Sequence, residues 1–192
     1  MWLVVGLGNP GKKYERTRHN VGQEAVAELA RRHGATLKEG RDKSLVAEFR
    51  IEDEVVVAAV PLTFMNDSGI AVRALTKRHN LKPDAFASRL VVVHDELDLA
   101  PGSVRVKSGG GLAGHNGLRS ITSHLSTQDY LRVRIGVGKP PSAELGADHV
   151  LRKVPPAERA LLDEAQNRAA DAIQSLVEKG LAATMNVFNQ TV

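Results

Sequence analysis

The chain has 192 residues, of which 42% are hydrophobic and 25% are charged; its net charge is +4 and it contains no cysteine. This composition predicts one domain, residues 1–192, with a sizeable core. It excludes disulfides and thiolate chemistry, and no apolar stretch approaches the ~20 residues of a membrane span. We therefore expect a cytoplasmic protein that does not enter the membrane.

Apolar runs and helical periodicity alternate along the chain. Strands are predicted at 2–7, 44–51, 54–60, 89–94, 103–107 and 131–137. Helices are predicted at 21–33, 69–79, 117–125 and 157–179, the last one following Pro155-Pro156 and ending at Gly180. This alternation indicates an α/β fold: a single-domain sandwich with a twisted mixed, largely parallel central sheet flanked by helices.

The first strand runs into a formal dinucleotide fingerprint, Gly6-x-Gly8-x-x-Gly11. That motif needs a helix directly after the glycines and an acidic residue about 20 residues later. Here Pro10 interrupts the motif, residues 12–19 have no apolar helical period, and the next strand begins near 45. We therefore favour a tight turn that presents Asn9, and a nucleotide-cofactor enzyme is the alternative.

Two strands predicted to be central end in polar residues. The first strand ends in Gly8-Asn9 and the strand at 89–93 is followed by His94-Asp95-Glu96-Leu97-Asp98. Because parallel strands bring their carboxyl ends together, Asn9, the loop with His19, and Asp95 are expected to meet. His19 and Asp95 are then a candidate base and its orienting carboxylate, with a purely structural histidine as the alternative.

Three asparagines lie at predicted element boundaries: Asn9, Asn66 and Asn116. Their amides suit recognition of a peptide group or stabilisation of an oxyanion. Helix capping is the alternative, since Asn116 precedes the helix at 117–125, and Asn20 with Gln23 is expected to cap the helix at 21–33.

Metal and nucleophile motifs are sparse. With no His-x-x-x-His spacing and no cysteine we expect no zinc site, and a Mg²⁺ site at Asp95 and Asp98 is the alternative. No Gly-x-Ser-x-Gly elbow occurs. A His–Asp pair is therefore expected to activate water without a cofactor.

Positive charge is concentrated between residues 102 and 139, where six Lys or Arg stand against one acid, giving +5. Such a segment suits nucleic acid, and a solvated face is the alternative. Aromatic residues make up only 4% of the chain, which disfavours a reader of stacked bases.

Five motifs occur in a defined order. They are Gly-Leu-Gly-Asn-Pro-Gly-x-x-Tyr-x-x-Thr-Arg-His-Asn-x-Gly (6–22), Thr-Phe-Met-Asn-x-Ser-Gly (63–69), His-Asp-Glu-Leu-Asp (94–98), Gly-Gly-Gly-x-x-Gly-His-Asn-Gly-Leu (109–118) and Arg-x-Arg-x-Gly-x-Gly-x-Pro (132–140). Together they resemble bacterial-type peptidyl-tRNA hydrolases over nearly the whole chain. The resemblance implies a monomeric enzyme, without metal, cofactor or obligate protein partner, that hydrolyses the ester between a peptide and the 3′ end of tRNA. A non-catalytic tRNA-binding module is the alternative.

The resemblance also implies residue roles. His19 matches the catalytic base and Asp95 its orienting carboxylate. Substrate-binding positions are matched by Asn9, Tyr14, Met65, Asn66, His115 and Asn116, and a tRNA 5′-phosphate site by Arg105, Lys107 and Arg134. Residues 141–152 correspond to a lid beside the acceptor stem. Leu112 and Ala113 depart from the family's usual His and Gly in the glycine-rich loop.

Overall fold

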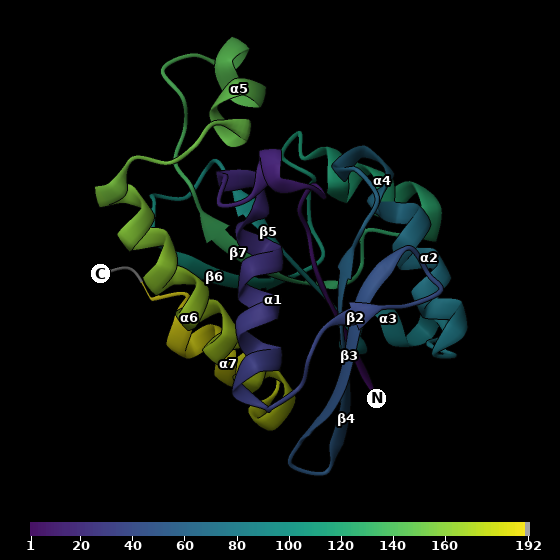
Figure 1. Cartoon of the computed structure of the whole chain (residues 1–192). Helices are drawn as coiled ribbons and strands as arrows, with labels where there is room; N and C mark the ends of the chain where they lie inside the picture. The colour runs from purple at the N-terminus through teal and green to yellow at the C-terminus, as the bar shows by residue number, and fades with distance from the viewer. Residues whose placement is uncertain (191–192) are drawn as a thin grey trace.

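The computed structural model describes residues 1–190, in which seven strands form one sheet between two layers of helices (Figure 1). The strands are β1 (Trp2–Gly6), β2 (Lys38–Glu39), β3 (Ser44–Ile51), β4 (Glu54–Pro61), β5 (Leu90–Glu96), β6 (Val104–Ser108) and β7 (Leu131–Gly136). Their order across the sheet is β2-β3-β4-β1-β5-β7-β6.

The middle of the sheet is parallel. β1 pairs in parallel with β4 and β5, and β5 pairs in parallel with β7, whereas the β2–β3, β3–β4 and β6–β7 pairs are antiparallel. Both β1 and β5 are buried on both faces, as their unbroken apolar sequences predict. The register pairs Gly6, the last residue of β1, with Val93, so β5 continues past the end of β1 as far as Glu96. The predicted mixed, largely parallel α/β sandwich is confirmed.

Helices cover both faces (Figure 1). α1 (Val21–Arg32), α6 (Pro156–Lys179) and α7 (Leu181–Phe188) lie on one face; α2 (Ser68–Arg78), α3 (Phe86–Arg89) and α4 (Asn116–Leu125) lie on the other. Because successive residues of a strand point to opposite faces, Val4 packs into the first layer and Val5 into the second. A short helix, α5 (Gly146–Leu151), projects beyond the sheet.

The predicted strands and helices are all present, with ends that differ by a residue or two. Within residues 1–190 the sequence missed β2, α3, α5 and α7, which are too short to show a clear period. The last two residues of the expected 1–192 domain lie outside the described residues. None of the helices described here has the length and hydropathy needed to cross a membrane.

Both capping predictions are wrong. Asn20 precedes α1 but makes no side-chain cap, because its amide is used elsewhere. Asn116 is the first residue of α4, and the cap is His115, whose ring accepts from the backbone N–H groups of Gly117 and Leu118. The amide of Asn20 is committed to the backbone of Asn9, and α4 begins one residue earlier than predicted, so its capping position falls to His115.

The glycines after β1 serve close packing, and the dinucleotide alternative is wrong. Two 3-10 helices, Lys12–Tyr14 and Arg18–Asn20, separate β1 from α1, so the α-helix that a dinucleotide site needs does not begin at the glycines. A Cβ on Gly6 would lie 2.5 Å from the Gly22 carbonyl oxygen, and one on Gly22 would lie 2.2 Å from the Val93 carbonyl oxygen. The start of α1 therefore rests directly on the backbones of β1 and β5.

The open edge of the sheet at β6 is partly closed by a side chain. Asn189 Oδ1 accepts from the Val106 N–H at 2.8 Å, and Asn189 Nδ2 donates to the Val106 carbonyl at 2.7 Å. This pair of hydrogen bonds reproduces what a neighbouring strand would make.

We predict that Gly22→Ala destabilises the protein by about 1–3 kcal/mol, because the new methyl group meets backbone that cannot move aside. Gly146→Ala is the matched control, since a Cβ there has no neighbour within 4 Å and is expected to change stability by less than about 0.5 kcal/mol. Urea unfolding of both variants measures the difference. Equal stabilities would contradict the close-packing role.

Candidate active site

A cavity of about 850 Å³ opens beyond the carboxyl ends of β1 and β5. Its polar floor holds residues that follow these two strands, and its outer wall includes α5. The lining residues include Asn9, His19, Phe64, Met65, Asn66, Asp95, Glu96, Asp98, His115, Asn116, Ala147, Val150 and Leu151. This is where an open α/β sheet is expected to place its ligand.

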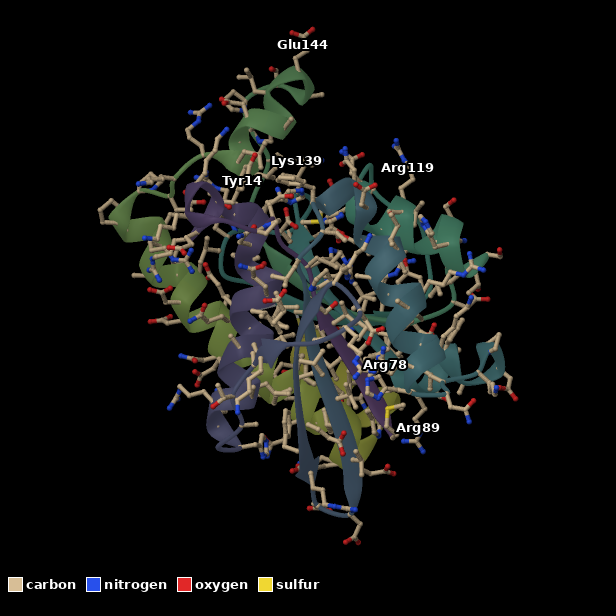
Figure 2. The ribbon with its side chains drawn as sticks, turned by 45° about the vertical axis from the view of Figure 1, so that its right-hand side comes forward. Tyr14, Arg78, Arg89, Arg119, Lys139 and Glu144 are labelled. Atoms are coloured by element: carbon tan, nitrogen blue, oxygen red, sulfur yellow. The ribbon has the colours of Figure 1, made fainter. Side chains whose placement is uncertain are left out.

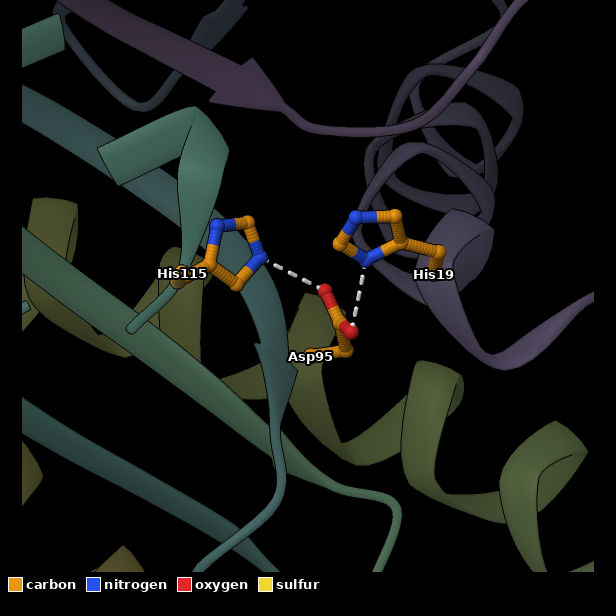
Figure 3. A group of neighbouring side chains, drawn as sticks. All are labelled: His19, Asp95 and His115. Carbon is orange, nitrogen blue, oxygen red and sulfur yellow. Dashed lines mark hydrogen bonds and ion pairs between the residues drawn. The ribbon is translucent and has the colours of Figure 1, made fainter. Parts of the chain in front are cut away.

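At the centre of the floor a carboxylate lies between two histidines (Figure 3). Asp95, at the end of β5 and 3% exposed, accepts from His19 Nδ1 through Oδ2 at 2.8 Å. Its other oxygen, Oδ1, accepts from His115 Nε2, also at 2.8 Å. Nδ1 of His19 is therefore the donor, and its Nε2 is left to accept a proton.

The position of the His115 proton is set by its role as helix cap. Because its Nδ1 accepts from the N–H groups of Gly117 at 3.1 Å and Leu118 at 3.3 Å, the proton lies on Nε2 and points at Asp95. A metal-bound nitrogen needs a free lone pair, which Nε2 of His115 does not offer. The His19–Asp95–His115 group is thus built for proton donation to a carboxylate and does not fit a cation.

The alternative Mg²⁺ site finds no support in the arrangement of its two candidate ligands. Both oxygens of Asp95 are occupied by histidines. Asp98 is exposed and pairs with Lys139 at 3.1 Å.

The pKa values of Asp95 and His19 are shifted in opposite directions. Burial raises the pKa of Asp95, but the charges and hydrogen bonds of His19 and His115 outweigh it and hold that pKa well below its usual range. Burial lowers the pKa of His19, whereas the charge and hydrogen bond of Asp95 raise it, with a net rise above the ordinary 6.5. At neutral pH the carboxylate of Asp95 is therefore ionised, and it favours the protonated form of His19.

A third histidine is held neutral behind this group. Burial and the neighbouring His115 lower the pKa of His94 to about 3, and its Nδ1 donates to the Asp95 carbonyl at 2.8 Å. Its ring meets that of His115 edge-on at 5.1 Å. The neutral His94 ring therefore packs against the ring of His115 and helps to hold it in place.

The sequence did not predict the role of Asn20, whose side chain holds Asn9 in place. Its Oδ1 accepts from the Asn9 N–H at 2.8 Å and its Nδ2 donates to the Asn9 carbonyl at 3.0 Å. The side-chain Oδ1 of Asn9 in turn accepts from the Met65 N–H at 2.7 Å, which leaves Nδ2 of Asn9 as a free donor. The one signal in the sequence was that Asn20 directly follows His19.

Seven of the eight residues predicted to be catalytic or substrate-binding line the cavity; they are Asn9, His19, Met65, Asn66, Asp95, His115 and Asn116. The eighth, Tyr14, does not line it. Its ring packs edge-on against Phe64 at a centroid distance of 6.3 Å, and Phe64 forms part of the cavity wall. Tyr14 therefore contacts the cavity wall only indirectly, through Phe64.

The predicted phosphate-binding residues lie on the adjacent edge of the sheet and outside the cavity lining. Arg105 and Lys107 of β6 stand opposite Arg134 and Arg132 of β7. Burial and nearby guanidinium groups lower the pKa of Lys107 and of Arg134. Glu96 connects the two regions, since it lines the cavity and lies 3.9 Å from Arg134.

Arg132 holds the glycine-rich loop that leads to His115. Its fully buried guanidinium donates to the carbonyls of Gly110 at 2.9 Å and Gly111 at 2.6 Å, and stacks over Tyr130. In the same loop Leu112 packs against the core layer formed by α2, α3 and α4. Leu112 and Ala113, which depart from the family pattern, therefore lie in a loop that is held in place by Arg132 and by the packing of Leu112.

These features define a class: an α/β enzyme with a hydrogen-bonded His–Asp pair in a cavity at the ends of parallel strands. The sequence model of the peptidyl-tRNA hydrolase family matches residues 3–192. The chain belongs to the peptidyl-tRNA hydrolase family.

Individual relatives agree. Peptidyl-tRNA hydrolase of Cutibacterium acnes is 45% identical over 98% of both chains, and that of Chloroflexus aggregans is 46% identical over 98% of this chain and 99% of the relative. The crystal structure of peptidyl-tRNA hydrolase from Acinetobacter baumannii superposes with a TM-score of 0.91 at 40% identity, covering 98% of this chain and 94% of that one.

We predict that Asp95→Asn lowers the His19 pKa below 6.5, because burial then acts without the opposing carboxylate. A general base must be unprotonated to accept a proton. The raised pKa of His19 in the native protein therefore means that activity increases only at a higher pH than it would with an ordinary histidine. An NMR titration of the His19 ring protons measures the shift. Asp98→Asn, an exposed carboxylate of the same cavity, is the control, and equal His19 pKa values in the two variants would contradict the coupling.

Proposed function

We propose that His19 performs the family's reaction, hydrolysis of peptidyl-tRNA, as a general base that activates water. The observation that carries this proposal is the His19–Asp95 hydrogen bond of 2.8 Å, which leaves Nε2 of His19 free at the cavity floor. Asp95 fixes the tautomer and stabilises the imidazolium that forms. A positioned base of this kind contributes about 10²–10⁴-fold to a rate.

The proposed reaction begins when Nε2 of His19 takes a proton from water. The water oxygen bonds to the ester carbonyl carbon, and the carbonyl oxygen takes up the negative charge. The bond from that carbon to the ribose oxygen then breaks, and the ribose oxygen receives the proton from His19. The products are a peptide acid and a tRNA with a free 3′ end, and no redox partner is needed.

The three asparagines are proposed to position the peptide and the water. Asn9 offers a free Nδ2 donor because its Oδ1 is already occupied by Met65 N–H. Asn66 and Asn116 are exposed and line the same cavity. One amide donor to an oxyanion contributes about 10²–10³-fold. Met65 and His115 complete the floor, and Tyr14 supports the Phe64 wall.

We propose the face formed by Arg105, Lys107 and Arg134 as the site of the tRNA 5′-phosphate. Lys and Arg on a sheet edge contact phosphates without reading sequence, so they set affinity and its dependence on salt. Glu96, close to Arg134 and in the cavity wall, gives a short structural connection between this face and the reacting ester.

The proposal extends to the setting in which the enzyme works. Residues 1–192 would act as one catalytic domain, as a monomer in the cytoplasm, needing neither cofactor nor protein partner. The rival, a tRNA-binding module without catalysis, leaves unexplained why a buried carboxylate orients a histidine whose second nitrogen faces the cavity.

Release of an N-blocked amino acid from tRNA tests the reaction. We expect His19→Ala to lower the rate by about 10²–10⁴-fold, since the general base is lost, while tRNA affinity stays within twofold. The wild-type rate is expected to be unchanged by a chelator. Near-normal turnover in His19→Ala would reject the assignment, and tRNA binding without any wild-type turnover would favour the binding module.

A separate prediction concerns the basic face. Lys107→Ala and Arg134→Ala are expected to raise KM and to reduce the slope of log affinity against log salt by about 1 each, because each removes a phosphate contact. Lys38→Ala is the control, since Lys38 is exposed on β2 at the opposite edge of the sheet. A slope that matches the control would remove these residues from the phosphate site.

A further inference from the structure

Arg18 precedes the proposed base in the chain but points away from the cavity, into a buried ion pair. Its Nε and Nη2 donate to the two oxygens of Glu158 in α6, each at 2.9 Å. Its remaining nitrogen, Nη1, donates to the His149 carbonyl of α5 at 3.0 Å. Arg18 is only 5% exposed. Each of its three side-chain nitrogens donates to a residue of another segment.

The helix that Arg18 contacts forms one wall of the cavity. α5 contributes Ala147, Val150 and Leu151 to the lining, yet it projects beyond the body of the molecule (Figure 1). Figure 2 shows Glu144, just before α5, at the far end of this projection. A wall that projects in this way needs an attachment at its base.

The side-chain attachments of α5 gather at one residue. Within residues 1–190, apart from the Asp148–Arg152 pair at the end of the helix itself, the side-chain hydrogen bonds that join α5 to other segments all involve His149. Its Nε2 donates to the carbonyls of Val137 at 3.2 Å and Gly138 at 3.1 Å, and its own carbonyl receives Arg18. A backbone bridge between Thr17 and Lys153 ties down the segment that follows α5.

We propose that Arg18 is a positioning residue that sets α5, and with it the outer wall of the cavity, relative to His19. The two hydrogen bonds to Glu158 fix the orientation of the guanidinium plane. The third donor, Nη1, then fixes the position of α5 through the His149 carbonyl. Because Arg18 and His19 are consecutive in one 3-10 helix, the wall and the base share a single rigid support. The inference rests on the proposed function of His19.

This role depends on the shape of the guanidinium group. A lysine carries the same charge but has one nitrogen, so it cannot satisfy both Glu158 oxygens and the His149 carbonyl in fixed directions. Arg18→Lys keeps the charge and removes the geometry. Glu158→Gln leaves Arg18 in place and removes the charged half of its fork.

The chain supplies a matched control one residue further along α6. Arg159 is also buried and forms an ion pair with Glu24 of α1, with its Nη1 donating to the Arg16 carbonyl at 3.1 Å. It links α6 to the same N-terminal region but makes no hydrogen bond to α5. Arg159→Lys and Glu24→Gln therefore remove a comparable ion pair and leave the wall attached.

The experiment compares the two pairs of variants in the full chain, using N-blocked aminoacyl-tRNA as substrate. For Arg18→Lys and Glu158→Gln we expect kcat/KM to fall about 10- to 100-fold, because displacement of a positioning group by about 1 Å can cost that much. We expect most of the loss in KM, which the cavity wall controls. Amide hydrogen exchange of residues 146–151 should accelerate in the same variants, while the Arg159→Lys and Glu24→Gln proteins match the wild type in both readouts.

Each outcome decides the inference. Equal KM and equal exchange at 146–151 in the two pairs would overturn it, since Arg18 would then be an ordinary buried ion pair. If Arg18→Lys does not fold, Glu158→Gln against Glu24→Gln carries the same comparison. Failure of the proposed function has a different signature, namely His19→Ala turning over normally, whatever the Arg18 variants do.

Discussion

The ionised carboxylate of Asp95, buried at the end of a central strand, is the constraint on which the rest of the site depends. A charge in this position is tolerated only because two histidines donate to its two oxygens. Loss of one partner from a buried charged pair typically costs about 3–5 kcal/mol. Both the 3-10 helix that carries His19 and the loop that carries His115 must therefore close on β5 for the chain to be stable.

This requirement explains the local sequence on both sides. His19 can reach Asp95 only if α1 begins close to the strands, and Gly6 with Gly22 permits that approach. His115 can donate to Asp95 only with its proton on Nε2, and its capping of α4 ensures this. Asn20 next to His19 then orients Asn9, so one short segment places the proposed base and a hydrogen-bond donor together.

Sequence reasoning was accurate where local chemistry decides the structure and incomplete where distant partners do. The apolar runs at β1 and β5 were sufficient to predict the parallel centre, and the polar residues after them were sufficient to bring His19 and Asp95 together. In contrast, α5 has six residues with no clear period and is held by Arg18, 131 positions away along the chain. The amide of Asn20 had an ordinary local use as a cap, and only the folded chain shows that Asn9 takes it instead.

The same use of an asparagine side chain occurs at the far end of the chain, where Asn189 pairs with Val106 on the outer strand. An unpaired outer strand is a template on which another polypeptide can add itself and start aggregation. Here that strand also carries Arg105 and Lys107, the residues proposed to contact tRNA phosphates. The Asn189 amide occupies the hydrogen-bonding groups of Val106 in the middle of the strand, and the two cations disfavour pairing with a second copy. The proposed tRNA-binding face can therefore stay exposed without promoting strand addition.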